Sequence, residues 1–449
     1  MSEYNINLDK RYRMPEEIQV INYSDKILVI APQFANWIVL ESPSQLSVFN
    51  YFKQGHSIQE TISNINFNIE SINYVVTQLE AKKFCNKEVH SSTDDERSMH
   101  LYLTNKCNLA CPHCYMFSGK PNANELTTEE ILKLIAEYRE IVKGTRITLS
   151  GGEPTSHVDF DLIVKTAAEI GLEVKILTNG TQMNPERIDK LSQYIQSVQI
   201  SIDGFSEETN SPIRGRGSFS KALEAVDSFV KHGIETSIAV TPPFEILQNH
   251  IEDYISFAKN LAAKYTGKPL LIKFAEGLSS GREINPTKEF NEEYANLIKR
   301  IQKQIYDDDY DLITFVETIR NDVIMDNCMF GVFSIASNGD VYFCPDIGEL
   351  SPIANIRTSS IKDIFKKSLI AEKATLISKL KPCNECELRY ICGGGCRTKE
   401  FPELVNRTSF ENINYDSIPI RFCNSKIKER FYNLMIQSNE YLYTSLDEE

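Results

Sequence analysis

The chain has 449 residues, 41% of them hydrophobic and 24% charged, which is typical of a folded protein with roughly two to four domains. Its 48 basic and 62 acidic residues leave a net charge of −14, which argues against binding to nucleic acid or to an anionic membrane surface. No apolar run is long enough to span a bilayer and the first residues do not resemble a signal peptide, so we expect a cytosolic protein.

Residues 1–85 are expected to form a small α+β domain. Two stretches rich in β-branched residues, 18–21 and 26–30, flank a turn at 23–25 and predict a hairpin, to which 37–40 would add a third strand. Apolar residues then recur at helical spacing over 46–49, 58–65 and 72–79, which predicts three helices after the sheet. The polar residues 86–97 indicate a linker.

From residue 98 to residue 308, short strands alternate with helices. Strands are expected at 100–104, 146–149, 174–177, 197–201, 236–240 and 270–274. Helices are expected over 127–142, from 159, from 185, from 219, over 247–263 and over 287–305. This order predicts an α/β fold with a parallel sheet covered by helices, and six units rather than eight indicate an open, partial (β/α)6 barrel. Its active site should lie at the carboxyl ends of the strands.

Over 309–449 the alternation stops, and cysteines, glycines and turns become frequent. A segment with so little apolar periodicity is expected to need inorganic cross-links. Ten of the 11 cysteines fall into two groups, at 107–114 and 328–423, and their close spacing in a reducing compartment favours metal binding over disulfides. The eleventh, Cys85, is expected to be a small buried apolar residue. A redox or radical enzyme, a zinc-stabilised binding module and a structural protein remain possible at this point.

The first group, Cys107, Cys111 and Cys114, directly follows the first barrel strand. Three thiolates on one loop can hold three irons of a [4Fe–4S] cluster and leave the fourth iron without a protein ligand. An open iron is what a cluster that takes part in chemistry requires. The alternative is a structural zinc site, which needs four ligands, and His113 beside Cys114 has poor geometry to serve as the fourth.

Further motifs follow the second and fourth strands: Gly151-Gly-Glu-Pro154, Ser201-Ile-Asp203 and, soon after, Arg214. Together with Cys-x₃-Cys-x₂-Cys after strand one, they resemble the radical S-adenosylmethionine (SAM) superfamily. The resemblance implies that SAM binds through its amino group at Gly151, Gly152 and Glu153, its ribose at Ser201 and Asp203, its carboxylate at Arg214 and its adenine beside His113, where the family usually has an aromatic residue.

The resemblance also implies a mechanism. The amino and carboxylate groups of SAM chelate the open iron, and an electron from the cluster cleaves the S–C5′ bond. The product is a 5′-deoxyadenosyl radical that takes hydrogen from an unactivated carbon, and a barrel lumen would shield it from solvent. The electrons would come from a reductant such as flavodoxin or ferredoxin.

The second group resembles in its spacing the SPASM domain, an extension of radical SAM enzymes that modify peptides and proteins. The resemblance implies two auxiliary [4Fe–4S] clusters, and so three clusters in all. One cluster would be fully coordinated by four cysteines, Cys383, Cys386, Cys392 and Cys423. The other would be held by three, Cys328, Cys344 and Cys396. A pair of zinc ribbons is the alternative, which the preceding barrel disfavours.

Many relatives, including anaerobic sulfatase maturases, carry an extra cysteine six residues before the first of these seven, where this chain has Asp322. Either Asp322 or another oxygen completes that cluster, or one iron stays open. An open iron could bind a substrate thiolate and position its sulfur, as is thought for relatives that make thioether bridges in ribosomal peptides. No general base can be named, since Asp346 lies near Cys344 but one position away from the base of sulfatase maturases.

The N-terminal domain resembles the winged-helix-like peptide recognition element of ribosomal-peptide maturases, in which a leader peptide adds as a strand to the sheet edge. The alternative is a DNA-binding winged helix. Residues 1–85 hold seven basic and nine acidic residues, so the domain lacks the basic surface that DNA binding needs.

The sequence therefore predicts a radical SAM/SPASM maturase of a precursor peptide, with thioether formation as the first choice of reaction. The enzyme alternative is another modification on the same scaffold: a C–C or C–O cross-link, or oxidation of a Cys or Ser to formylglycine in a sulfatase. The alternative that is not an enzyme is a zinc-ribbon adaptor that binds peptides.

Overall fold

The computed structural model describes residues 7–91, 97–306, 312, 315–316, 322–348 and 350–444. Its N-terminal part is a small antiparallel sheet of strand order β1-β2-β3 (Gln19–Tyr23, Lys26–Ala31, Asn36–Leu40), followed by helices α1 (Pro43–Lys53), α2 (Ile58–Ile62) and α3 (Ile69–Ala81). The hairpin, the third strand and the three helices expected from the sequence are confirmed. Side chains of Ser42, Ser57 and Asn68 cap the three helices, which explains where each begins.

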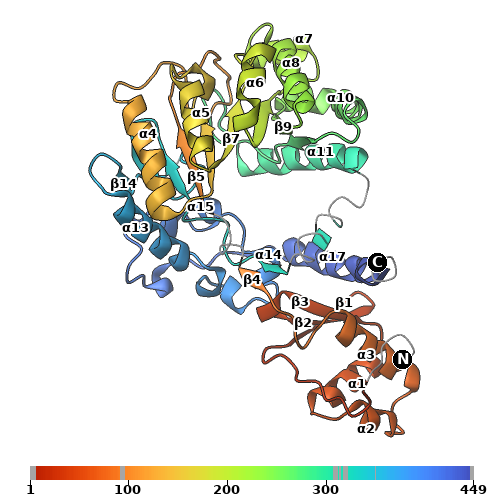
Figure 1. Ribbon diagram of the computed structural model, residues 1–449. Coiled ribbons are helices and arrows are strands. Elements are labelled where there is room, and N and C mark those ends of the chain that lie inside the picture. The colour runs from red at the N-terminus through yellow and green to blue at the C-terminus, as the bar shows by residue number, and fades with distance from the viewer. Residues whose placement is uncertain are drawn as a thin grey trace.

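The two faces of this small sheet pack against different parts of the chain. One face meets α1 and α3 in a core that includes Val29, Ile38, Phe49 and Val75. The other face places Trp37 against α17 (Ser425–Thr444), and the Trp37 Nε1–H donates to the Met435 carbonyl at 3.0 Å. Figure 1 shows α17 between the N-terminal domain and the rest of the molecule. The N-terminal domain is therefore attached to the end of the chain by an apolar interface.

The middle of the chain is the partial barrel. Its parallel strands follow one another in chain order: β5 (Ser98–Tyr102), β6 (Arg146–Ser150), β7 (Glu173–Thr178), β8 (Ser197–Ser201), β9 (Glu235–Val240) and β10 (Leu270–Phe274). Helices cover the outside of this sheet: α4 (Thr128–Glu137), α5 (Phe160–Glu169), α6 (Pro185–Leu191), α8 (Ser218–Lys231), α10 (Ile251–Lys264) and α11 (Lys288–Tyr306) (Figure 1). The predicted partial (β/α)6 barrel is confirmed.

Two further helices were not expected from the sequence. The short α7 (Glu207–Arg214) follows β8, and α9 (Phe244–Asn249) precedes α10, so the helix expected over 247–263 is two helices. Side chains alternate between the two faces of the sheet along β5 and β6. Met99, Leu101 and Ile147 lie in the core under the helices, so the residues next to them in these two strands point to the lumen side.

The C-terminal cysteine-rich part extends the same sheet. Strand β12 (Phe333–Ile335) pairs in parallel with β5, and β13 (Asp340–Tyr342) and β14 (Ala354–Asn355) follow it as antiparallel strands. Helix α13 (Ile361–Ala374) covers this extension, and the short helices α14 (Arg389–Cys392), α15 (Arg397–Glu400) and α16 (Pro402–Val405) lie among the cysteines. The division of the chain at 85, 98 and 308/309 stays a prediction, because the barrel and the C-terminal part share one sheet.

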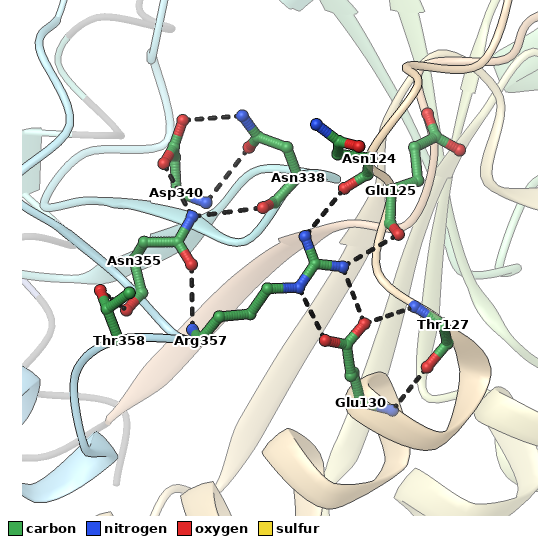
Figure 2. A network of polar contacts seen from close by, with 9 residues as sticks. All are labelled: Asn124, Glu125, Thr127, Glu130, Asn338, Asp340, Asn355, Arg357 and Thr358. Atoms are coloured by element: carbon green, nitrogen blue, oxygen red, sulfur yellow. Dashed lines mark hydrogen bonds and ion pairs between the residues drawn. The ribbon is translucent and has the colours of Figure 1, made fainter.

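A polar junction fixes this extension to the barrel. The Arg357 guanidinium forms two hydrogen bonds with the Glu130 carboxylate, at 2.7 and 2.8 Å, and donates to the carbonyls of Asn124 and Glu125 (Figure 2). Within the expected linker, β4 (His90–Ser91) pairs with β11 (Val323–Ile324), and residues 92–96 lie outside the described ranges. None of the helices within those ranges is both long and apolar enough to cross a membrane.

Candidate active site

The cysteine loop leaves β5 at the carboxyl edge of the sheet, where the sequence predicts the active site. Glu125 closes the base of this loop, since its carboxylate accepts hydrogen bonds from the Thr104 hydroxyl at 2.7 Å and from the Asn105 N–H at 2.6 Å. Across the loop, the Cys107 N–H donates to the Gly119 carbonyl at 3.0 Å. The loop is therefore a closed, hydrogen-bonded unit that presents its three thiols on one side.

These three thiols line a cavity of about 350 Å³ above the barrel lumen. Of the residues predicted to bind SAM, all but Asp203 line the same cavity: His113, Gly151, Gly152, Glu153, Ser201 and Arg214. Strand ends far apart in the sequence thus converge on one space, as the parallel order of β5 to β8 requires. The site also includes Thr178, Asn179, Leu278 and Ser279, which the sequence analysis missed. Thr178 and Asn179 end β7 with polar groups before a glycine, a signal that could have identified them.

The two glycines of the second motif let its backbone touch the cysteine loop. A Cβ at Gly151 would lie 2.4 Å from the Thr104 carbonyl oxygen, and its φ of +137° also favours glycine. A Cβ at Gly152 would lie 2.6 Å from the carbonyl oxygens of Asn105 and Lys106. Because the contacting atoms are backbone oxygens, a clash with a larger residue could not be relieved by rotating a side chain. The glycine motif therefore packs against the backbone of the cysteine loop, in addition to its predicted role in binding SAM.

Glu153 is fully buried and held by its neighbours. Its Oε1 accepts hydrogen bonds from the hydroxyls of Thr155 and Thr178, both at 2.6 Å, and its Oε2 accepts one from the Asn179 N–H at 2.7 Å. Burial raises the pKa of Glu153, and these hydrogen bonds oppose the rise. Because each carboxylate oxygen has two lone pairs, Oε2 keeps capacity for one more donor, which fits the predicted contact with the SAM amino group.

Asp203 lies behind the cavity wall and does not line it. Its Oδ2 accepts from the Arg214 Nε at 2.5 Å and its Oδ1 from the Thr241 N–H at 3.1 Å, while its side chain is wholly buried. The His113 Nε2 lies 3.4 Å from the same Oδ2, and burial lowers the pKa of His113 although Asp203 opposes this. In this structure Asp203 orients Arg214 and His113, and its contact with ribose stays a prediction.

Three thiols in the wall of one cavity are a donor set that suits an iron–sulfur cluster. Burial raises the pKa of Cys107 to about 11, so at neutral pH this thiol keeps its proton until a metal ion replaces it. The resemblance to radical SAM enzymes assigns a [4Fe–4S] cluster here. Cys107, Cys111 and Cys114 are the residues that would hold it.

Four of the remaining cysteines surround a second, small cavity. Its wall contains Cys383, Cys386, Cys392 and Cys423, as the predicted ligand set requires, together with Arg421 and Lys428. Arg421 Nη1 lies 4.0 Å from the Cys383 sulfur and donates to the Gly394 carbonyl at 2.6 Å. Cationic groups next to thiols suit a cluster whose thiolate ligands carry negative charge.

The last three cysteines also come together. Burial, the Asp346 carboxylate and the thiols of Cys396 and Cys328 all raise the pKa of Cys344, which reaches about 12. The Arg397 N–H donates to the Cys328 sulfur at 3.3 Å. The side chain of Arg397 is completely buried between the two cysteine sets, and its guanidinium donates to the carbonyls of Thr375, Gly393 and Gly395. One arginine therefore ties the loops of both sets together.

A larger cavity of about 470 Å³ is lined by residues of the barrel part and by residues close in sequence to two of these cysteines, though by none of the three cysteines themselves. Tyr115, Leu278 and Ser279 line both this cavity and the one above the lumen, so the two adjoin. Asp346 and Thr398 are in its wall, and the Thr398 hydroxyl lies 3.0 Å from the Cys396 sulfur. Cys85, by contrast, packs in the N-terminal core with its sulfur 3.8 Å from that of Met14.

Comparison with known proteins agrees with this geometry. Residues 101–258 match the model of the radical SAM superfamily, and residues 327–387 match that of an iron–sulfur cluster-binding domain, SPASM. The mycofactocin maturase MftC of Mycolicibacterium smegmatis is 29% identical over 310 residues, which cover 67% of this chain and 77% of MftC. The AdoMet-dependent heme synthase of Methanosarcina barkeri is 30% identical over 333 residues, which cover 69% of this chain and 93% of that enzyme.

Among solved structures, native anSMEcpe with bound AdoMet and the Cp18Cys peptide has a TM-score of 0.55 at 19% identity, and the match covers 77% of this chain and 100% of that one. This likeness supports the fold. The identity to the heme synthase over nearly its whole length establishes the family, which removes the zinc-ribbon adaptor from the possibilities. The chain belongs to the radical SAM superfamily and carries a SPASM domain, and it is an enzyme that uses SAM and [4Fe–4S] clusters, auxiliary ones included.

Proposed function

We propose that this enzyme matures a ribosomally made precursor peptide by joining a cysteine sulfur of the peptide to one of its carbon atoms in a thioether. The observation that carries the proposal is the pair of adjoining cavities. One is lined by the cysteine loop and the predicted SAM contacts, and the wall of the other contains Asp346 and Thr398, whose hydroxyl lies 3.0 Å from the Cys396 sulfur. A peptide in the second cavity can present a carbon atom to the first while its thiol stays beside the auxiliary cysteines.

The surroundings of Asp322 support an open iron for that thiol. The Asp322 carboxylate lies 3.5 Å from the Lys87 Nζ, and its backbone carbonyl accepts a hydrogen bond from the His90 N–H at 2.9 Å. Its charge is thus already paired with a lysine. This leaves Cys328, Cys344 and Cys396 as the thiols of that set, and a substrate thiolate as the proposed fourth ligand.

The reaction balances with the groups that the chain provides. When bound, the SAM cluster supplies a 5′-deoxyadenosyl radical that takes one hydrogen atom from the substrate carbon. The peptide thiol would lose its proton when its sulfur binds as a thiolate, and the C–S bond would form as one electron passes to an auxiliary cluster. Asp346 is the acidic residue in the wall of the second cavity and is the candidate to receive the proton. A small carrier such as flavodoxin or ferredoxin would supply the reducing electron.

Among the described residues, the N-terminal sheet has β1 and β3 as its two edge strands. On the β3 side, N–H groups already donate to side-chain oxygens. The Trp37 N–H donates to Asn36 Oδ1, the Val39 N–H to Gln78 Oε1 and, just after the strand, the Glu41 N–H to Gln45 Oε1. Strand β1 is the opposite edge of the sheet, and Val20 on it is 42% exposed. We therefore place the proposed docking of the leader as an added strand at β1.

The compared proteins support a peptide substrate without fixing the bond that is made. MftC is named a maturase, and the anSMEcpe structure holds a peptide together with AdoMet. The heme synthase shows that the same architecture also serves another substrate class. A C–C or C–O cross-link and formylglycine formation are the competing outcomes on a peptide or protein.

The test is anaerobic incubation of the reconstituted enzyme with SAM, dithionite and the peptide encoded beside its gene, followed by tandem mass spectrometry. A thioether removes two hydrogens per cysteine, blocks alkylation of that cysteine and yields 5′-deoxyadenosine in proportion. The variant Cys111→Ala should give no product, because the SAM cluster would lack one of its ligands. A modified peptide whose cysteines all remain open to alkylation would contradict the thioether and favour a C–C or C–O cross-link.

A further inference from the structure

The loop after β10 forms several hydrogen bonds with the cysteine loop. Arg282 Nη1 donates to the Cys111 carbonyl at 3.2 Å, and its Nη2 donates to the Ser118 carbonyl. The Glu283 N–H donates to the Pro112 carbonyl at 2.8 Å. Three carbonyls of the cysteine loop are thus held by two consecutive residues that lie about 170 positions further along the chain.

Gly281 packs directly against the backbone of the cysteine loop. A Cβ at this position would lie 2.7 Å from the carbonyl carbon and oxygen of His113 and 3.0 Å from its Cα. No side chain is involved on the His113 side, so an added methyl group would have to move the backbone between Cys111 and Cys114. Gly281 therefore permits an approach that no other residue allows.

The loop after β10 is itself held in place by hydrogen bonds to α11 and within its own turn. Leu278 is buried, and its N–H and carbonyl bond to the side chain of Asn291 on α11, at 2.8 and 3.0 Å. The Gly281 N–H donates to the Ile284 carbonyl at 2.7 Å, which closes a tight turn around Arg282. Gly277, Leu278 and Ser279 also line the cavity of the cysteine loop. One short, anchored segment thus forms part of the cavity wall and holds the cysteines.

We propose that residues 277–283 act as a clamp that positions the cysteine loop for SAM, with Arg282 as its positioning residue. Arginine suits this role because its planar, permanently charged fork reaches two carbonyls that are seven residues apart. A lysine could bond only one of them at a time. The clamp fixes where the cluster ligands sit relative to Gly151–Glu153, and so whether the amino and carboxylate groups of SAM can reach the open iron. The inference rests on membership of the family and not on the proposed thioether.

The test compares Arg282→Ala, Arg282→Lys and Gly281→Ala in the full-length reconstituted enzyme, with Arg300→Ala on the exposed face of α11 as the matched control. Iron and sulfide per chain, the binding curve of SAM and the change that SAM causes in the EPR spectrum of the reduced protein are measured. Only the cluster that binds SAM responds to SAM, so the difference spectrum isolates it. We expect SAM affinity to fall about tenfold in Arg282→Ala with iron retained, and Arg282→Lys to recover part of the loss.

Gly281→Ala keeps the guanidinium and moves the backbone instead, so it tests the same clamp by an independent route. We expect it to weaken SAM binding and to diminish the EPR response as Arg282→Ala does. If both variants bind SAM as the wild-type enzyme does, the clamp is wrong. It is also wrong if they lose iron and thermal stability together while the remaining cluster still responds normally to SAM, because that pattern indicates a purely structural contact. If Arg282→Ala does not retain iron, the SAM binding and EPR response of Gly281→Ala decide whether the clamp is correct.

Discussion

Gly152 lies so close to the start of the cysteine loop that its missing side chain is part of the site. Its N–H donates to the Thr104 carbonyl at 2.8 Å, and the next N–H, of Glu153, donates to the Lys106 carbonyl at 2.9 Å. These bonds join the second strand end to the first and set the spacing between the cysteines and the predicted SAM contacts. A family motif that is usually described through its ligand is here also held in place by backbone packing.

Gly152→Ala should therefore disrupt the SAM site while the rest of the fold survives. The new Cβ would lie 2.6 Å from two backbone oxygens, which forces the loop to shift at a cost of about 1–3 kcal/mol. We expect loss of iron from this cluster and a fall of more than about 100-fold in reductive SAM cleavage, measured as 5′-deoxyadenosine. Gly119→Ala is the control, because a Cβ there meets nothing within 4 Å. Equal activity of the two variants would show that the close approach does not matter.

The sequence predicts positions at strand ends well and predicts poorly what supports them. Cys107, Gly152, Glu153 and Ser201 could be placed because each lies at the end of a strand or within a few residues after it, and parallel strands bring their carboxyl ends together. Asp203 shows the limit of this reasoning. It follows β8 as expected, yet its carboxylate is used by Arg214 and Thr241 behind the wall. Nothing in the spacing distinguishes a residue in the wall from one behind it.

At the scale of elements, the junction of Figure 2 decides how the C-terminal hairpin meets the barrel. Arg357 lies two residues after the end of β14, and Asn355 on that strand donates to the Asn338 carbonyl and the Asp340 carboxylate. On the barrel side Glu130 belongs to the capping box of α4 with Thr127. The junction therefore links the first turn of a barrel helix to the hairpin that leads to the auxiliary cysteines.

Arg357→Ala should loosen this junction measurably. The ion pair is about one-third exposed, so screening by solvent reduces what it contributes, but it is bidentate and the same guanidinium also serves two carbonyls. We expect unfolding free energy to fall by about 1–2 kcal/mol and the melting temperature by a few degrees, measured on the anaerobic holoenzyme. Lys133→Ala, at an exposed site on α4 with a 3.8 Å ion pair, should change stability by less than about 0.5 kcal/mol. A similar loss in both variants would contradict the argument.

Local pattern was sufficient for the barrel elements and insufficient for the sheet extension. The strands β5 to β10 have five or six residues each, and burial alternates along β7 and β8, which is a strong local signal. Strand β12 has three residues and pairs with β5 more than 230 positions earlier in the chain. Neither the length nor the sequence of β12 predicts that it pairs with β5, because this pairing depends on two distant parts of the chain folding against each other. The continuation of the barrel sheet into the C-terminal part could therefore not be predicted.

At the scale of the whole molecule, the two ends of the chain meet. The N-terminal sheet buries Trp37 against α17, and α17 begins two residues after Cys423, a predicted cluster ligand. Glu17, just before β1, also pairs with Arg389 on α14, between Cys386 and Cys392. Through these contacts the domain proposed to bind a leader peptide rests on the same elements that hold an auxiliary cluster.

Trp37 is the single tryptophan of the chain and is 1% exposed, so tryptophan fluorescence reports on the burial of this one face of the N-terminal sheet. We expect Met435→Ala, which empties a fully buried position on α17, to destabilise the interface by about 2–5 kcal/mol. In a urea titration the red shift of Trp37 emission should then occur at a clearly lower midpoint, while the EPR response of the barrel cluster to SAM in the absence of urea stays unchanged. Gln437→Ala, exposed on the same helix, should leave the midpoint where it is. If Met435→Ala also leaves it unchanged, the N-terminal domain is held to α17 by contacts other than this apolar interface, and its coupling to the cluster helices must be sought at Glu17 and Arg389.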